Sequence, residues 1–215
     1  MDRIAYVGAP LDQTIPDVIE ISVLKIQYLD ISGIGTVRDP LVLTSKRGVI
    51  SLKMSSVKIE SKRAYCIGDV TARYMKEIYG MECAVPAQQN SMGLAELVSS
   101  REKKVEIVSS DSISRKFIEK LEDAGIAYRY TIAYMVVENE NVDYSLLAGV
   151  KRIVVGSPRS FQIISKRASG YLEGKEIYAI GIPTYNEIIS SGFRAEGHFD
   201  RPDIVNIIAK LKTQR

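Results

Sequence analysis

An internal repeat constrains the fold of this chain more than any other feature. Residues 43–47 (LTSKR) resemble residues 155–159 (VGSPR), and residues 65–71 (YCIGDVT) resemble residues 178–184 (YAIGIPT). The second copy begins 112 residues after the first. Each copy can be read as strand, Ser-containing loop, helix, strand, Gly-containing loop and helix. Two widely spaced copies predict two similar domains and not a solenoid of short repeats.

Short apolar runs alternate along the chain with longer segments of helical period. We expect strands at residues 4–7, 25–30, 41–44, 64–67, 104–108, 128–136, 152–155 and 177–180. We expect helices at residues 70–79, 93–99, 112–124, 184–191 and 202–212. Several strands are almost wholly apolar, which is typical of parallel strands covered on both faces. The alternation therefore predicts βαβ units and an α/β fold.

Four hydroxyl side chains occupy matched positions in the two copies: Ser45, Thr71, Ser157 and Thr184. Each one, taken alone, can be explained as an ordinary helix cap. The match across both copies favours a second role, because the free backbone N–H groups at helix starts bind anions. These loops follow strands, and open α/β sheets bind ligands at the carboxyl ends of their strands. We therefore expect a shared cleft for an anionic ligand.

Composition excludes several classes of function. The chain has 215 residues, of which 46% are hydrophobic and 26% charged, and a formal net charge of +3, too mild for a dedicated nucleic-acid binder. His198 is the only histidine, so a Ser-His-Asp triad could form only around it, and we expect it in a solvated loop. We expect Cys66 and Cys83 to be small core residues and not metal ligands. The sequence shows no nucleotide-binding motif, membrane-spanning run or signal-peptide pattern, so we expect a cytoplasmic protein without membrane or nucleic-acid partners.

The repeated motifs resemble those of uroporphyrinogen-III synthases. That family places Thr-Ser at the end of a strand and Gly-x-x-Thr-Ala at the start of a later helix, and the pattern recurs in its second half. A polar segment with Asn and Leu-Ala lies between the halves. The matching segments are residues 44–45, 68–72, 90–95, 156–158 and 181–184. The resemblance spans nearly the whole chain; one departure is Ser109-Ser110-Asp111, where the family often has glycine.

The resemblance implies an α/β fold of two similar parallel-sheet, flavodoxin-like lobes joined by a double crossover, with a cleft between them. One lobe would comprise residues 1–34 and 138–215, and the other residues 37–133. Linkers would lie near residues 33–38 and 134–140, where glycines and charged residues suit flexible connections.

The resemblance also implies the reaction. Family members cyclise hydroxymethylbilane, a linear tetrapyrrole with eight carboxylates, to uroporphyrinogen III in heme biosynthesis. The last pyrrole ring is inverted through a spiro intermediate, whereas spontaneous closure gives the I isomer. Such a protein has to position a reactive intermediate and exclude water. We therefore expect no cofactor and no metal, a monomer, and at most a transient contact with the enzyme that supplies the bilane.

Tyr134 matches the tyrosine of the family, and we expect it to assist departure of the substrate hydroxyl. Strict alternation would place Tyr128 and Tyr130 on the same face of the strand, so the pattern alone does not single out Tyr134. The residues expected to bind substrate are Thr44, Ser45, Arg47, Gly68, Thr71, Asn90, Ser157, Arg159, Gly181 and Thr184. Arg47 and Arg159 follow the two repeat serines at equal offset, and each is either a carboxylate partner or a solvated helix-start residue.

Two other functions fit the same pattern. A hinge-closing binding module for an anionic small molecule can also be built from two α/β lobes. A phosphosugar isomerase or transferase can use Ser and Thr loops to bind phosphate. The second would need a Glu or His base beside those loops, and Asp69 is the only nearby carboxylate in the repeat.

Overall fold

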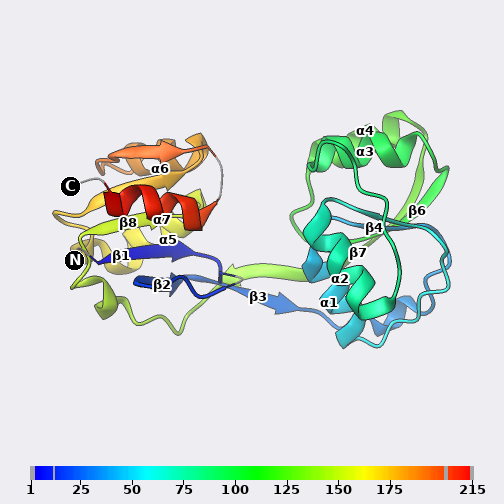
Figure 1. Ribbon diagram of the computed structural model, residues 1–215, viewed down its shortest axis with the longest axis horizontal. Helices are drawn as coiled ribbons and strands as arrows, with labels where there is room; N and C mark the ends of the chain where they lie inside the picture. Colours follow the sequence, from blue (N-terminus) through cyan, green and yellow to red (C-terminus); the bar gives the residue numbers. More distant parts are fainter. Residues whose placement is uncertain (1–2, 12, 201–202, 214–215) are drawn as a thin grey trace. The chain divides into compact units, whose positions relative to one another are not determined.

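The computed structural model describes residues 3–11, 13–200 and 203–213. The chain divides into two compact units, which we call unit 1 (Met1–Ile26 and Val136–Arg215) and unit 2 (Gln27–Met135). Each unit is a five-stranded sheet with helices packed on it (Figure 1). The predicted α/β class with mostly parallel sheets is therefore confirmed. The lobe boundaries and linkers expected from the family stay a prediction.

The sheet of unit 1 has the strand order β10-β9-β8-β1-β2, and all of its neighbouring strands run parallel. Its strands are β1 (Ile4–Gly8), β2 (Val18–Ser22), β8 (Arg152–Val155), β9 (Glu176–Ile180) and β10 (Gly197–Phe199). Numbered along the chain, this is the flavodoxin-like order 2-1-3-4-5. The carboxyl ends of these strands consequently share one edge of the sheet.

Helices cover both faces of this sheet. The helices of unit 1 are α5 (Pro158–Ala168), α6 (Ile182–Ser190) and α7 (Ile204–Thr213), with short 3-10 turns η2 (Tyr144–Leu147) and η3 (Ser169–Tyr171). Phe161 of α5 packs in one core with Val7 and Val155, whereas Leu211 of α7 packs in another with Ile4. Alternate residues of a strand face opposite sides, so α5 and α7 cover opposite faces of the sheet (Figure 1).

The sheet of unit 2 has the order β3-β7-β6-β4-β5. Its strands are β3 (Leu24–Tyr28), β4 (Leu41–Leu43), β5 (Ala64–Cys66), β6 (Lys104–Ser110) and β7 (Ala127–Glu138). The pairs β7–β6, β6–β4 and β4–β5 are parallel. The backbone N–H of Leu29 donates to Ala133 O at 3.0 Å and that of Asn139 to Val23 O at 2.9 Å, a pattern that runs antiparallel along β3 and β7. The chain thus passes from one unit to the other within β3 and returns within β7.

The helices of unit 2 are α1 (Lys46–Met54), α2 (Asp69–Tyr79), α3 (Ser91–Ser99) and α4 (Arg115–Asp123), with a 3-10 turn η1 (Ser32–Ile34). Leu94 of α3 and Phe117 of α4 are fully buried in one core with Ile107. On α1, Gly48 lies so close to the sheet that a Cβ there would be 2.9 Å from Val108 O. Among the described residues, no helix of either unit is long and apolar enough to cross a membrane.

Three sequence expectations about these elements were wrong. His198 lies in the short strand β10 and not in a loop, because three residues with a polar centre give too little pattern to be recognised as a strand. Strand β2 was not expected either. Helix α4 begins at Arg115 and not at Ser112, which leaves Ser112 and Ser114 in the preceding loop.

The cysteines also differ from the expectation. Cys66 is fully buried as predicted, but it forms a disulfide with Cys83. The segment that carries Cys83 returns beside β5, where Cys66 N–H donates to Ala84 O at 3.0 Å and Ala84 N–H donates to Ala64 O at 2.8 Å. Helix α2 separates the two cysteines in sequence, so their proximity depends on how the chain returns after that helix.

Candidate active site

Unit 2 contains a cavity of about 260 Å³ at the carboxyl edge of its sheet. Seven of the residues that line it carry a hydroxyl group: Thr44, Ser91, Ser109, Ser110, Ser112, Ser114 and Tyr134. Parallel strands bring these groups together, since Thr44 directly follows β4 and Ser110 ends β6. Hydroxyls can donate to an anion or accept from a polar group, so the cavity suits a carboxylate or a hydroxyl of a ligand.

Thr44 and Tyr134 were predicted from the sequence, but the serines of this cavity were not. Four serines fall within residues 109–114, directly after a buried strand, and that density was the available signal. In the sequence, this stretch is recognisable only as a departure from the family pattern. In the structure it forms one wall of the cavity, and the Thr44 and Ser109 hydroxyls are hydrogen-bonded to each other.

A bulge in the sheet separates Tyr134 from the other tyrosines of β7. Pairing between β6 and β7 shifts at Ser109/Ser110, so that Ser110 lies opposite Tyr134. Strict alternation therefore does not hold to the end of the strand. The Tyr128 hydroxyl donates to Glu122 at 2.7 Å, and the Tyr130 hydroxyl donates to the backbone oxygen of Ser110. The Tyr134 hydroxyl makes no hydrogen bond with any other described residue, although the Tyr134 side chain lines the cavity.

Three helices of unit 2 start at this edge of the sheet. Ser45 caps α1 by accepting from Arg47 N–H at 3.2 Å, and Asn90 caps α3 by accepting from Gly93 N–H at 2.9 Å. Gly68 is the N-cap of α2 but has no side chain to accept a bond. Gln89 does so instead, through its Oε1, which lies 3.1 Å from the N–H of the next residue, Asp69.

A Cβ at position 68 would lie 2.6 Å from the same Gln89 oxygen, so a side chain there would displace the Gln89 amide from Asp69. The expectation that Thr71 caps α2 was wrong. Thr71 lies inside the first turn, is 4% exposed, and its hydroxyl is not bonded to another described residue.

The matched loops of unit 1 repeat this pattern. Ser157 caps α5 by accepting from Ser160 N–H at 3.1 Å. Gly181 is the N-cap of α6 with a positive φ of 79°, a conformation that favours glycine. Thr184 is 1% exposed and, like Thr71, is not the cap that was expected. The two copies of the repeat are therefore alike in structure, with Ser and Gly at the helix starts and a buried Thr in the turn that follows Gly.

The two repeat arginines differ. The Arg159 guanidinium donates to Val136 O at 2.6 Å. The Arg47 guanidinium has no hydrogen bond or ion pair with another described residue, although Arg47 is half-buried. Arg47 and Arg159 lie at the same offset in the two copies of the repeat. Their surroundings differ, because β7 supplies a backbone oxygen to Arg159 only.

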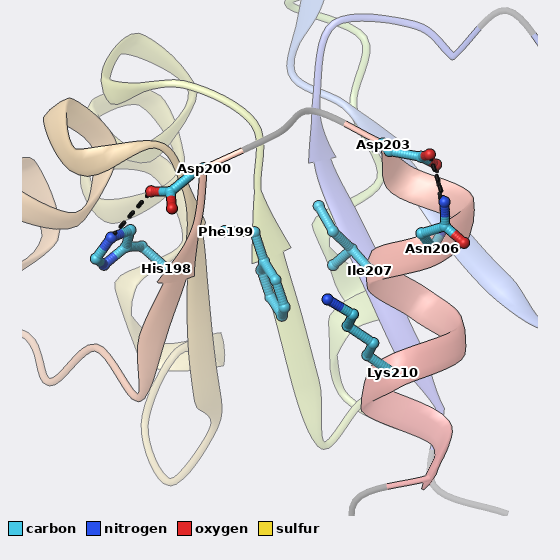
Figure 2. Close-up of a pocket in the computed structure, with 7 residues that line it drawn as sticks. All are labelled: His198, Phe199, Asp200, Asp203, Asn206, Ile207 and Lys210. Carbon is cyan, nitrogen blue, oxygen red and sulfur yellow. Dashed lines mark hydrogen bonds and ion pairs between the residues drawn. The ribbon is translucent and has the colours of Figure 1, made fainter.

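A second cavity, of about 520 Å³, lies between β10 and α7 of unit 1 (Figure 2). It is lined by His198, Phe199, Asp200, Asp203, Asn206, Ile207 and Lys210. His198 Nε2 lies 3.3 Å from Asp200 Oδ1, and its ring contacts Tyr185 at 5.5 Å between centroids. None of the expected site residues lines this cavity, and its lining contains two aspartates beside Lys210 and His198.

Comparisons with known proteins agree with the repeat and with the fold. The family profile described as uroporphyrinogen-III synthase HemD matches residues 15–209. A uroporphyrinogen-III synthetase structure from Helicobacter pylori 26695 is 18% identical, covers 100% of both chains and has a TM-score of 0.71. A mutant uroporphyrinogen III synthase from the extremely thermophilic bacterium Thermus thermophilus is 14% identical, covers 99% of this chain and 98% of its own, and has a TM-score of 0.59. At these identities the solved structures show a common fold, and no curated protein sequence gives a significant match.

The family profile is the basis for assigning the family, because it matches most of the chain. Its range includes both copies of the repeat, the helix starts at the carboxyl edges of both sheets, and every residue that lines the cavity of unit 2. The chain belongs to the uroporphyrinogen-III synthase family.

Proposed function

We propose that the hydroxyl-lined cavity of unit 2 holds the reacting end of hydroxymethylbilane and that Tyr134 assists departure of its terminal hydroxyl. Family membership assigns the reaction itself, cyclisation to uroporphyrinogen III in tetrapyrrole biosynthesis. One observation supports the role of Tyr134 above all others. Of the three β7 tyrosines compared above, Tyr134 alone lines the cavity and has a hydroxyl without a partner among the described residues.

The chemistry of the cavity fits this reaction. A tyrosine hydroxyl can donate a hydrogen bond to the leaving oxygen, which departs as water once it has gained a proton. Departure of water, with loss of the pyrrole N–H proton to solvent, leaves an electrophilic azafulvene, and the substituted carbon of the last pyrrole attacks it. The protein has to hold that ring in the orientation that leads to the III isomer, and serine hydroxyls and helix-start N–H groups can fix the carboxylates.

The remaining expected residues are proposed to bind substrate carboxylates. In unit 2 these are Thr44, Ser45, Arg47, Gly68, Thr71 and Asn90, and in unit 1 they are Ser157, Arg159, Gly181 and Thr184. The matched helix starts support this role. For Arg159 the bond to Val136 O would have to be shared with or exchanged for a carboxylate.

We further propose that the chain acts as a cytoplasmic monomer that receives the bilane through a transient contact with the preceding enzyme. Rapid transfer would limit spontaneous closure to the I isomer. Light scattering of the purified protein, alone and with the bilane-forming enzyme, tests the monomeric state and the contact.

The decisive test is an isomer assay. Hydroxymethylbilane is generated in situ, the products are oxidised, and the porphyrin isomers are separated by chromatography. We expect the wild type to give mainly the III isomer, and Tyr134→Phe to lose at least about 100-fold in kcat because it lacks the donor. Tyr128→Phe is the matched control, since its hydroxyl bonds Glu122 instead.

An unchanged kcat and isomer ratio in Tyr134→Phe would sink the proton-donor role. Formation of the I isomer alone by the wild type, at the rate without protein, would refute the proposed activity of the isolated chain.

A further inference from the structure

Tyr28 lies beside Tyr134 in unit 2. The ring of Tyr28, on β3, contacts the ring of Tyr134, on β7, with 6.5 Å between centroids and 52° between planes. Lys46 Nζ lies 5.1 Å from the centre of the Tyr74 ring. Arg47 is the second residue of α1, directly after the loop that contributes Thr44 to the cavity. Tyr28 is thus a neighbour of Tyr134 to which no role has been assigned.

Arg47 stands out among the arginines by its surroundings. Of the described arginines that are not exposed, Arg152 is paired with Glu176 at 2.8 Å, whereas the Arg47 guanidinium has no hydrogen bond or ion pair with another described residue. A half-buried guanidinium has lost part of its hydration, so an ion partner would offset that cost. Its planar donors match a carboxylate well.

Tyr28 lies close to this charge. Burial raises the pKa of the Tyr28 hydroxyl, and the positive charges of Arg47 and Lys46 reduce this rise. Ser51, one helical turn after Arg47, donates to Ala133 O at 2.7 Å, which places this face of α1 beside the strands that carry Tyr28 and Tyr134. The Tyr28 hydroxyl, like that of Tyr134, forms no hydrogen bond with another described residue. Two adjacent donors are consequently free to converge on one anion.

We propose that Tyr28 and Arg47 together bind one carboxylate of the linear tetrapyrrole and so position the reacting pyrrole beside Tyr134. This inference rests on the proposed function of the cavity. It makes Tyr28 a substrate-positioning residue that the family motifs did not indicate. The ring contact between Tyr28 and Tyr134 fixes the position of the bound carboxylate relative to the Tyr134 hydroxyl.

The test compares Tyr28→Phe, Arg47→Gln and the double variant in the isomer assay. Tyr28→Phe keeps the ring contact with Tyr134 and removes only the hydroxyl. We expect each single variant to raise KM about tenfold, because each loses one hydrogen bond to a charged group, while kcat changes less than in Tyr134→Phe. The double variant should raise KM by less than the product of the two single effects, since both residues bind the same carboxylate.

Salt dependence gives a readout that a purely structural role would not change. The KM of the wild type should rise with ionic strength more steeply than that of Arg47→Gln. Arg101→Gln is the matched control, because Arg101 is exposed and has no side-chain partner among the described residues.

Other outcomes separate this inference from the proposed function. A wild type that makes the III isomer, together with an unchanged KM in Tyr28→Phe and Arg47→Gln, would overturn the carboxylate site and leave the role of Tyr134 intact. A lower kcat with unchanged KM in Tyr28→Phe would also overturn it, by showing that Tyr28 acts in the chemical step. Failure of the proposed function would instead appear in the wild type or in Tyr134→Phe.

Discussion

Reduction of the Cys66–Cys83 disulfide should destabilise unit 2 without unfolding it. The bond closes a loop with a sequence separation of 17 residues. The chain-entropy relation for a loop of this length gives about 3 kcal/mol at 25 °C. Domains of ordinary stability are stable by roughly 5–15 kcal/mol, so the reduced protein should stay folded.

The backbone around the disulfide supports this expectation. Ala84, next to Cys83, donates to Ala64 O at 2.8 Å and accepts from Cys66 N–H at 3.0 Å, and neither bond involves sulfur. The returning segment should therefore stay paired with β5 after reduction. The loss of stability on reduction should come mainly from the greater conformational freedom of the unfolded chain.

Urea unfolding with and without a phosphine reductant measures the difference. The chain has no tryptophan, so far-UV circular dichroism or tyrosine fluorescence is the probe, and a thiol titration confirms the redox state. Cys83→Ala should unfold at the same urea concentration with and without reductant. A difference below about 0.5 kcal/mol in the wild type, with two thiols titrated after reduction, would refute the reasoning.

Two further predictions concern stability. Gly93→Ala should lower the free energy of unfolding by about 1–3 kcal/mol, because the new Cβ would lie 2.2 Å from Gln88 O, whereas Gly170→Ala meets nothing within 4 Å and should be nearly neutral in the same urea assay. A hydrogen bond from Arg152 lowers the pKa of the Glu176 carboxyl, so this carboxylate stabilises the folded state above its unfolded pKa of about 4.3, and the contribution is lost as pH falls through the lower folded pKa. Glu176→Gln should therefore cost about 1–2 kcal/mol at pH 7 and almost nothing below both pKa values, and an equal cost at both pH values would contradict this explanation.

Local pattern was enough for much of the fold. Eight strands and the helices after the repeat loops could be predicted, because apolar period and capping residues are properties of neighbouring positions. Weak or short patterns failed, as in the three-residue strand β10 that contains His198. The sequence allowed Thr71 and Thr184 to cap their helices, but Gly68 and Gly181 occupy the cap positions, which places each Thr within the first turn.

The sequence by itself determined the α/β class, the duplication and, through motif order, the family. Only the tertiary structure decided that Ser109 meets Thr44, that Cys66 pairs with Cys83, and that Arg47 is left without a protein partner among the described residues. These outcomes depend on contacts between segments far apart in the chain. The bulge that places Tyr134 opposite Ser110 is one example: a shift of one residue in strand pairing changes which side chain reaches the cavity, and no local period records that shift.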